Sequence, residues 1–514
     1  MVYAAYGISG LTGIAGTFFV KEYLDLSAEF LAALAFWAGI PWALKMPVGH
    51  VVDLMWRWKA ALVWLGAGAI ALSLLILVAM VEHPAAMART MTLDHWYVLA
   101  ALLAPTAYMV QDAVADAMTV EAVPRVDEHG VAYDEATRKS MHTTMQTLGR
   151  VAVIGGLALV AGANVWIFYG TEALPQEEKG RLYAYIFKLA LAIPLVSVLG
   201  VVLHGAIKWR DARRLRAQGR SQAEVEHLLA VHGEEKTRPN WAILGGSLVF
   251  VAMTLGVGLS ALPYGQELIF AGSFAVIVFL LWRLARELSP EARETLVATA
   301  LILFVYRATP STGQGTTWWM IDVLGFDPSF QAKLALVAYL LTLAGMFGLR
   351  GYMARNSIAS IVVMLTLAGT VISLPNIGMF YGLHEWTARH TGGLVDQRTI
   401  AIIDTALESP LGQIAMIPML AWIANTAPAN LKATYFAVMA SFSNLALSAA
   451  QLGTKYLNQV YVVTREVRDQ ATGQIRIPAD YHEVGALMIA ATLITLLVPL
   501  VAVAGVRLLR LRTA

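Results

Sequence analysis

The chain has 514 residues, of which 58% are hydrophobic and only 14% are charged, whereas ordinary globular domains contain roughly 25% charged residues. So few charges could not cover the surface of a soluble protein of this length, which excludes a soluble globular fold. The lack of cysteine excludes disulfides, thiolate nucleophiles and zinc–sulfur sites, and 37 basic against 35 acidic residues argue against nucleic acid as a partner. The composition predicts an all-α polytopic membrane protein.

Runs of about 20 mostly apolar residues predict the membrane-spanning helices. The first run follows Met1 without a basic segment or a small-residue cleavage site, so we expect a true span and not a signal peptide. The fourteen predicted spans are, in chain order, 2–20, 29–51, 60–81, 96–120, 141–165, 182–206, 241–262, 268–288, 292–312, 329–349, 357–381, 399–423, 433–455 and 483–506.

The distribution of Lys and Arg predicts the orientation, because cytoplasmic loops carry an excess of both. With the N-terminus inside, the inner loops hold most of the basic residues, and the inner segment 208–240 holds the densest group. In the longest outer loop, 456–481, two β-prone runs flank Ala471-Thr472-Gly473 and predict a hairpin. We therefore expect an integral protein of the cytoplasmic (inner) membrane with both termini in the cytoplasm.

An internal repeat relates the start of the chain to its middle. Residues 6–38 match residues 306–338 without a gap, with ten identical positions. The identical pairs are Tyr6/Tyr306, Thr12/Thr312, Gly13/Gly313, Thr17/Thr317, Leu24/Leu324, Phe30/Phe330, Ala32/Ala332, Leu34/Leu334, Ala35/Ala335 and Ala38/Ala338. Membrane composition explains coincidences of Leu and Ala but not the alignment of Tyr, Thr, Gly and Phe. The ninth span therefore begins a second copy of what began at the first.

The repeat divides the chain into two six-helix halves, 1–207 and 291–514. Between them we expect a cytoplasmic basic loop at 208–240 and an inserted two-helix hairpin at 241–290. Two parallel repeats of six helices are the build of the major facilitator transporters. The sequence thus predicts the major facilitator fold with an extra helical hairpin, about 14 transmembrane helices in all.

Ionisable side chains within the spans are costly in hydrocarbon and are candidate functional groups. Asp112 and Asp116, four residues apart, lie on one face of the fourth span, and two like charges so close suit a carrier that binds and releases protons. Lys45 is expected at the depth of Asp112. Arg150 lies about 15 Å into the fifth span, either as a contact for a substrate anion or as a partner for the two aspartates.

The second half carries a similar set of charges. Asp404 and Glu408 are again four residues apart, on the twelfth span, and Arg307 on the ninth span lies at a comparable depth. Both spans would line the substrate cavity of a facilitator, so we expect Arg307 to pair with one of the two acids. A static structural brace is the alternative.

A gate is predicted at the inner ends of the second and fourth spans. Gly49, Asp53 and Arg57 follow a spacing that resembles the inner-gate signature of the major facilitators. Glycine permits close helix contact, and the acid can brace neighbouring helix ends by pairing with a base. Glu121 and Arg125, at the inner end of the fourth span, are the expected partners.

Several segments together resemble the folate–biopterin transporter family of the major facilitators. They are spread in order over both halves, and each is a weak signal on its own. The segments are Phe18-Phe19-Val20-Lys21-Glu22-Tyr23-Leu24-Asp25-Leu26-Ser27, Asp112-x3-Asp116-Ala117-x3-Glu121-x3-Arg125, Ala308-Thr309-Pro310-Ser311 with Leu324-Gly325-Phe326, and Pro428-x5-Thr434-x-Phe436-Ala437.

The resemblance implies a secondary active transporter that works by alternating access on an organic, heteroaromatic and anionic solute such as a pterin or folate. Carboxylates would grip the amidine-like edge of a pterin, and Arg or Lys would bind the carboxylates of a folate. No ATP-binding loop is present, which implies coupling to an ion gradient such as protons, or simple facilitation. No cofactor or metal is expected.

Two other classes remain open at this stage. The fold could serve as a non-transporting subunit or assembly factor of a membrane complex, with the inserted hairpin or the outer loop 456–481 as docking surfaces for membrane-protein partners. A membrane-embedded enzyme is not expected, because the eleven histidines are scattered and lie mostly in loops.

Overall fold

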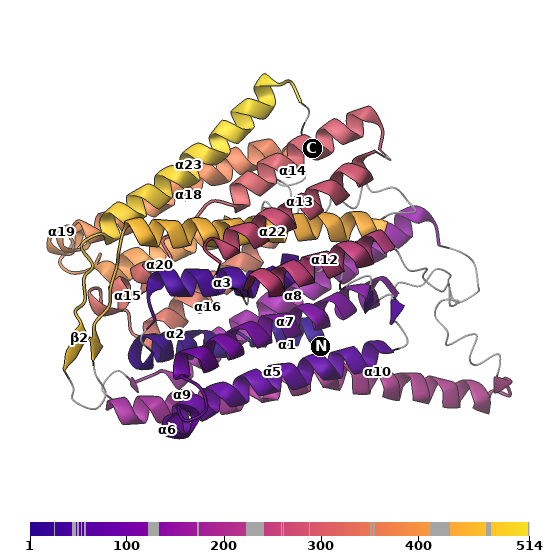
Figure 1. Ribbon diagram of the computed structural model, residues 1–514, viewed down its shortest axis with the longest axis horizontal. Helices are drawn as coiled ribbons and strands as arrows, with labels where there is room; N and C mark the ends of the chain where they lie inside the picture. Colours follow the sequence, from indigo (N-terminus) through magenta and orange to yellow (C-terminus); the bar gives the residue numbers. More distant parts are fainter. Residues whose placement is uncertain are drawn as a thin grey trace.

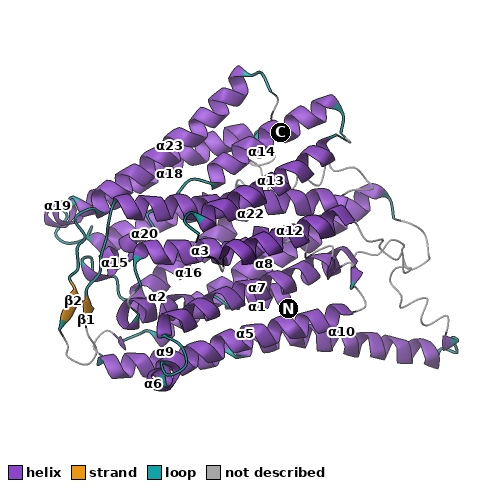
Figure 2. Ribbon diagram, viewed as in Figure 1, coloured by secondary structure: helices purple, strands orange, loops and turns teal. Residues whose placement is uncertain are grey.

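The computed structural model is a bundle of helices that lie side by side along one direction, with two short strands at one end (Figure 1; Figure 2). We call that end the strand end and the opposite end, where α10 stops, the α10 end. The sequence predicts the strand end to be the outer side. The structure describes the whole chain except residues 25, 44–47, 49–50, 53, 56–57, 122–132, 172–173, 223–240, 259, 261, 287, 350–351, 353–354, 412–431, 469–473, 512 and 514.

Helices make up nearly all of the described chain. The first predicted half contains α1 (Val2–Ile8), α2 (Leu11–Tyr23), α3 (Ala28–Ala43), α5 (Lys59–Glu82), α6 (Pro84–Met87), α7 (Leu93–Glu121), α8 (Glu135–Ile167), α9 (Gln176–Ala190) and α10 (Ala192–Ala217). The predicted hairpin contains α12 (Trp241–Gly258) and α13 (Gly265–Ala285). The second half contains α14 (Pro290–Arg307), α15 (Gln314–Asp322), α16 (Pro328–Gly348), α18 (Ile358–Phe380), α19 (Leu383–His390), α20 (Gln397–Glu408), the 3-10 turn η3 (Ser409–Leu411), α22 (Lys432–Val460) and α23 (Val484–Leu508).

The predicted fold class is confirmed, since every predicted span coincides at least in part with a helix. Within the described chain, eight helices are long and apolar enough to cross a membrane. They are Val2–Tyr23, Lys59–Glu82, Leu93–Asp116, Leu148–Ile167, Glu177–Ala217, Pro328–Gly348, Ile358–Phe380 and Val484–Leu508. One boundary differs from the expectation: α10 continues to Ala217, so the predicted basic loop at 208–240 begins as helix.

The first span is broken in the second repeat copy but continues almost unbroken in the first. Ser9 and Gly10, between α1 and α2, keep right-handed helical dihedral angles, whereas α14 ends at Arg307 and α15 begins only at Gln314. Gly313, with φ +71°, precedes α15 in a conformation that favours glycine. Non-helical backbone at membrane depth is tolerated where it is buried in protein or lines a cavity, so the break between α14 and α15 marks a candidate site.

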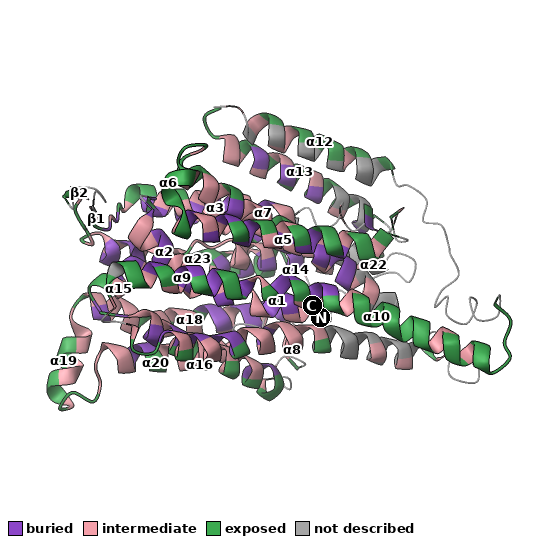
Figure 3. Cartoon of the chain, turned by 90° about the horizontal axis from the view of Figure 1, so that it is seen from below, coloured by how far each residue is buried: buried purple, intermediate pink, exposed green. Residues whose placement is uncertain are grey.

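The two halves meet along two pairs of helices. The most extensive contact between helices joins α3 to α22, and α8 packs against α16. Buried residues occur along the helices of the bundle, whereas the end of α10 is largely exposed (Figure 3). Each half also has a core of its own, around Phe19 and Phe187 in the first and around Trp319 and Leu487 in the second. This arrangement allows the halves to keep their internal packing if they move against each other.

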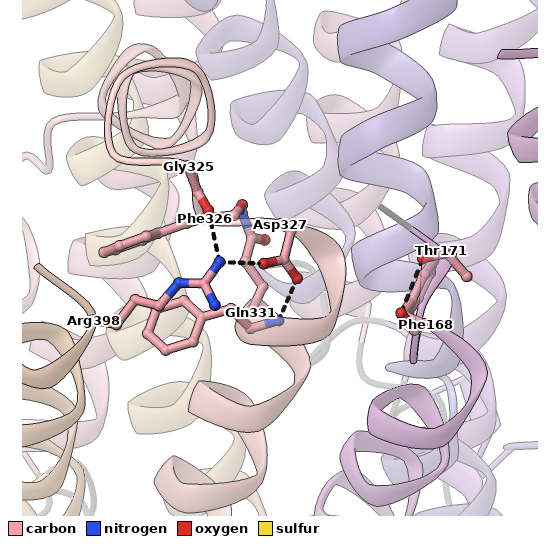
Figure 4. A network of polar contacts seen from close by, with 8 residues as sticks. Phe168, Thr171, Gly325, Phe326, Asp327, Gln331 and Arg398 are labelled. Carbon is pink, nitrogen blue, oxygen red and sulfur yellow. Dashed lines mark hydrogen bonds and ion pairs between the residues drawn. The ribbon is translucent and has the colours of Figure 1, made fainter. Parts of the chain in front are cut away.

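A polar network fixes the start of α16 at the strand end (Figure 4). Asp327 caps α16 by accepting a hydrogen bond from the backbone N–H of Phe330 at 2.8 Å. Arg398, near the start of α20, donates to Asp327 Oδ2 at 2.8 Å and to the carbonyl oxygen of Gly325 at 3.3 Å. Gly325 has φ +68°, which favours glycine. The motif Leu324-Gly325-Phe326 therefore has a structural role at this turn.

The predicted hairpin in the loop 456–481 is present. Strand β1 (Val467–Arg468) pairs antiparallel with β2 (Ile475–Ile477), and an isolated bridge joins Thr464 to Asp480. Ala471-Thr472-Gly473, which we expected at the turn, lies outside the described residues.

Candidate functional site

Close contact between α1 and α8 brings the first group of charges together. Gly7 and Gly156 face each other where these helices cross, and a Cβ atom on Gly156 would lie 2.9 Å from the Cα atom of Gly7. Gly149 leaves room for the ring of Tyr3, because a Cβ atom there would lie 2.9 Å from Tyr3 Cε2. Helix α1 thereby presents Tyr3 to the part of α8 that carries Arg150.

Asp112, Asp116 and Arg150 lie close to one another in the first half. The hydroxyl of Tyr3 donates a hydrogen bond to Asp116 Oδ1. The guanidinium of Arg150 lies within electrostatic reach of Asp116, Tyr3 and Asp112. The sequence analysis expected Arg150 to contact either a substrate anion or the two aspartates, and in the structure Arg150 lies beside the aspartates. All four side chains are at least partly accessible, so the cluster is open to a ligand.

A buried glutamine sets the rotation of α7 that directs these aspartates. Gln111 is fully buried and donates to the carbonyl oxygen of Val63 on α5 at 2.9 Å and to Ser197 Oγ on α10 at 3.1 Å. Because Gln111 anchors one face of α7 to its neighbours, the next residue, Asp112, is turned away from that contact. The sequence analysis did not identify Gln111.

Three aromatic side chains continue the site from the charged cluster. The ring centroid of Tyr6 on α1 lies 5.7 Å from that of Trp42 on α3 and 5.5 Å from that of Tyr108 on α7. Tyr108 is one helical turn from Asp112, so the aromatic and charged surfaces adjoin. The sequence analysis missed this cluster, although the repeated pair Tyr6/Tyr306 was a signal for it.

A cavity of about 340 Å³ opens beside the aromatic cluster. Its wall includes Ser9, with Thr12 and Gly13 in the first turn of α2, and Gln314 and Trp318 on α15. Tyr108 also lines it. The cavity therefore lies where the first span of one half meets the broken first span of the other. The N-terminus of the half-helix α15 carries partial positive charge that favours an anionic group.

Arg307 lies at the end of α14, near the other arginine. Its closest electrostatic neighbours within the described chain are Tyr306 and Arg150, one residue from each half. The expected pair of Arg307 with Asp404 or Glu408 stays a prediction. Two guanidinium groups from opposite halves face the same region.

Asp404 and Glu408 differ in their surroundings, although both lie on α20. Asn376 Nδ2 on α18 donates to Asp404 Oδ2 at 2.7 Å. The other oxygen, Asp404 Oδ1, is buried and accepts no hydrogen bond from the described residues. Glu408 is exposed and within electrostatic reach of Tyr306. Tyr306 is therefore within electrostatic reach of both Glu408 and Arg307.

The predicted inner gate and one predicted site residue fall outside the described residues. They are Lys45, Gly49, Asp53, Arg57 and Arg125. Glu121 is the last residue of α7. The inner gate, at the α10 end of the bundle, stays a prediction.

The structure instead describes a closure at the strand end that the sequence did not predict. Lys21 Nζ on α2 lies 2.5 Å from Asp322 Oδ1 at the end of α15, and both side chains are largely buried. The hydroxyl of Tyr481 donates to Asp322, and Arg465 donates to the carbonyl oxygen of Lys21. The Arg465 guanidinium lies 5.4 Å from the ring centroid of Trp318, which lines the cavity. The two halves and the loop 456–481 thus close this end of the bundle over the cavity.

The tyrosine in this closure remains a hydrogen-bond donor. Burial raises the pKa of Tyr481, and the hydrogen bond to Asp322 and the charge of that carboxylate raise it further. A neutral hydroxyl can donate to the carboxylate, whereas a phenolate would repel it. The closure is therefore set up to persist across the physiological pH range.

Comparison with known proteins gives consistent results. The model of the BT1 family matches residues 282–506. A folate-biopterin transporter of Synechocystis sp. is 21% identical over 448 residues, 87% of this chain and 71% of that protein. A putative folate transporter 2 of Plasmodium berghei is 24% identical over 163 residues, 30% of this chain and 33% of that protein.

Solved structures share the fold. A POT family transporter in complex with 5-aminolevulinic acid has a TM-score of 0.60 at 12% identity, covering 98% of this chain and 95% of that one. The nucleoside transporter NupG has a TM-score of 0.52 at 12% identity, covering 98% and 96%. The matched family and the named relatives are transporters and not enzymes. The similarity that the motifs indicated is confirmed: the chain is similar in sequence to the folate–biopterin transporters and shares the fold of these solved transporters.

Proposed function

We propose that this transporter moves a flat, anionic heteroaromatic solute of the pterin or folate class by alternating access. The observation that carries the proposal is the juxtaposition of Asp112, Asp116 and Arg150 with the aromatic cluster of Tyr6 and Tyr108. Its relatives named for folate and biopterin support the solute class.

Each part of such a solute has a matching group in the site. The amidine-like edge of a pterin can give two hydrogen bonds to one carboxylate, which Asp112 or Asp116 would supply. The ring system would stack on Tyr6 and Tyr108, because every aromatic heterocycle has a π-face. The carboxylates of a folate tail would pair with Arg150 or Arg307, which face the same region from opposite halves.

The size of the cavity favours the ring system as the part that is enclosed. Its volume of about 340 Å³ is near the lower end of the roughly 300–1,000 Å³ typical of ligand pockets. A pterin fills such a space, whereas the tail of a folate would extend toward the arginines. We therefore expect pterins to compete with folates for one site.

If transport of the solute is coupled to protons, a buried carboxylate without a neighbouring cation would bind the transported proton. Asp404 fits this role, because among the described residues its carboxylate has an amide as its polar partner and one oxygen without a hydrogen bond. Acids of this kind within a membrane bundle mark proton pathways. We expect Asp404→Asn to abolish uptake driven by a proton gradient while solute exchange across the membrane continues.

The test is uptake and exchange of labelled pterins, folates and aromatic acids by the purified protein in liposomes. Arg150→Gln should lower solute affinity by about tenfold or more, since hydrogen bonds to charged groups contribute roughly 1.5–3 kcal/mol. Tyr108→Ala should have an effect of similar size, since stacking of a heterocyclic base on an aromatic side chain contributes about 1–3 kcal/mol. Arg213→Gln, on the exposed part of α10, is the matched control and should leave affinity unchanged. A folded protein that binds none of these solutes, and that copurifies with a stoichiometric membrane partner, would favour the non-transporting subunit instead.

A further inference from the structure

A groove on the outside of the second half is separate from the proposed solute site. It has a volume of about 680 Å³ and runs along one face of α18, with a single residue of α23, Arg507, at one end. Residues of α18 form the rest of its wall. They are Ser360, Val363, Met364, Leu367, Ala368, Val371 and Ile372.

We propose that this groove binds one anionic phospholipid, with its phosphate at Arg507 and an acyl chain along α18. The apolar stretch from Val363 to Ile372 would hold the chain. The polar groups of the groove, Ser360 and Arg507, lie together at one end. The groove therefore has a polar end for the lipid headgroup and an apolar stretch for the acyl chain.

The length of the groove matches one leaflet. Ser360 and Ile372 are twelve residues apart, which corresponds to about 18 Å along a helix. Half of a hydrocarbon core of roughly 30 Å is about 15 Å. Ser360 lies in the first turn of α18 and Arg507 in the last turn of α23, so the groove runs from the membrane interface to about the middle of the bilayer.

The polar end offers hydrogen bonds and positive charge to a phosphate. Arg507 is exposed, and no ion pair or hydrogen bond of its side chain occurs among the described residues. Ser357 Oγ donates to Ser360 Oγ at 3.0 Å, which leaves the hydroxyl hydrogen of Ser360 available for another acceptor. The N-terminus of α18 adds its partial positive charge at the same end. Basic pockets of this kind between membrane helices recognise anionic headgroups.

A second copy of the chain is the competing occupant, and charge disfavours it. Two copies related by an axis along the membrane normal would hold Arg507 at the same depth in both. A dimer formed through this face would bring the two like charges toward each other at the membrane interface. A second copy would add this repulsion between two Arg507 side chains, whereas the negative charge of an anionic lipid would attract Arg507.

The experiment compares the purified protein in nanodiscs and in detergent with added lipid. We expect native mass spectrometry to detect one retained phosphatidylglycerol molecule in preference to phosphatidylcholine, and phosphatidylglycerol to raise the melting temperature more. Inorganic phosphate, which has the charge but no acyl chain, should leave the melting temperature unchanged.

Two variants address the two ends of the groove independently. Arg507→Gln should weaken phosphatidylglycerol retention about fivefold, as expected for one arginine near a headgroup. Ala368→Phe should block the acyl channel and reduce retention of every phospholipid at this site. Arg213→Gln, at the same end of the bundle on α10, is the control for non-specific attraction and should change neither.

Two results would overturn the proposal. Equal retention of both lipids by the unmodified protein, or retention unaffected by both variants, would rule out a headgroup-specific site. A dimer that Ala368→Phe dissociates, without loss of bound lipid, would assign the groove to a second copy.

Discussion

At the scale of single residues, the charges inside the bundle fall into two kinds. Arg150 lies beside Asp116 and Asp112, so its charge is balanced within the first half. Asp404 accepts a hydrogen bond from Asn376, has Glu408 within electrostatic reach, and has one carboxylate oxygen without a hydrogen bond from the described residues. In the proposed function, the cluster around Arg150 would exchange a protein partner for a charged solute, and Asp404 would carry a proton.

Neutralising the closure at the strand end should shift the protein toward opening at that end. Asp322→Asn removes the carboxylate that Lys21 and Tyr481 contact, at a cost of about 1 kcal/mol for an ion pair that is not fully buried. We expect cysteines introduced at Ser9 or Thr12, in the cavity wall, to react about fivefold faster with a membrane-impermeant maleimide.

A second ion pair at the same end serves as the control for this variant. Glu177→Gln removes a pair with Arg181 in which both side chains are about four-fifths exposed, and labelling should not change. Equal labelling of Asp322→Asn and the unmodified protein would show that Lys21 and Asp322 do not hold the closure.

The cap of α20 predicts a dependence of stability on pH. Asp396 accepts a hydrogen bond from the backbone N–H of Thr399 at 2.8 Å, and this bond lowers the pKa of Asp396. Its stabilising contribution is therefore complete above the unfolded pKa of about 3.9 and is lost as the pH falls through the lower folded value. Asp396→Ala should cost about 1 kcal/mol at pH 7, measured by thermal unfolding. Asp396→Asn keeps the cap and should lose this pH dependence; an equal loss in both variants would contradict the assignment.

At the scale of elements, the helices α12 and α13 touch both halves. Ile269 on α13 is buried against Phe36 on α3 and Leu452 on α22. Gln266 Nε2 donates to the carbonyl oxygen of Ala33 at 3.3 Å. The neighbouring Glu267 binds Lys455 on α22 at 3.2 Å. The proposed insertion is thus anchored at the interface along which the halves meet.

Replacing residues 241–288 with a flexible polar linker should leave a folded but less stable protein. The apolar surface uncovered on α3 and α22 would face lipid, which is as apolar as the helix it replaces. We expect monodisperse protein with a lower melting temperature in size-exclusion and unfolding assays. The double variant Gln266→Ala, Glu267→Gln keeps the helices and measures the anchoring contacts alone. Complete loss of folded protein on deletion would show that α12 and α13 belong to one of the halves.

At the scale of the whole molecule, the proposed solute site lies between the two predicted halves, each with a core of its own. Contacts of α3 with α22 and of α8 with α16 cross the boundary, and rocking of one half against the other would open one end as it closes the other. The pair of Lys21 and Asp322 joins the halves at the strand end, so locking it should stop the cycle.

A crosslink at this position is simple to introduce because the chain contains no cysteine. Lys21→Cys with Asp322→Cys, joined by a short bifunctional maleimide, should abolish uptake into liposomes. Each single cysteine treated with the same reagent should retain most of its uptake. Full uptake by the crosslinked protein would contradict alternating access through the strand end.

Much of the fold follows from composition and periodicity. Apolar runs long enough to cross a bilayer locate the helices, because no other regular structure except a closed barrel satisfies the backbone in hydrocarbon. The repeat of Tyr6 and Gly13 at Tyr306 and Gly313 located two copies, although the helix is broken at Gly313 and continues through Gly13. The candidate charges were also visible, since an ionisable residue in an apolar run is rare.

The sequence did not predict which of those charged side chains contact each other. Spacing along one helix fixes which residues share a face, but not how a helix is rotated against its neighbours. Gln111 sets that rotation for α7, and Gly7 with Gly156 sets how closely α1 approaches α8. The sequence by itself determined the membrane-spanning helices, the repeat and the buried acids and bases, because these depend on the order of residues along single helices. Only the tertiary structure decided that Arg150 lies beside Asp116, that Arg307 and Arg150 approach each other from opposite halves, and that Lys21 meets Asp322, because these contacts depend on packing between helices distant in the chain.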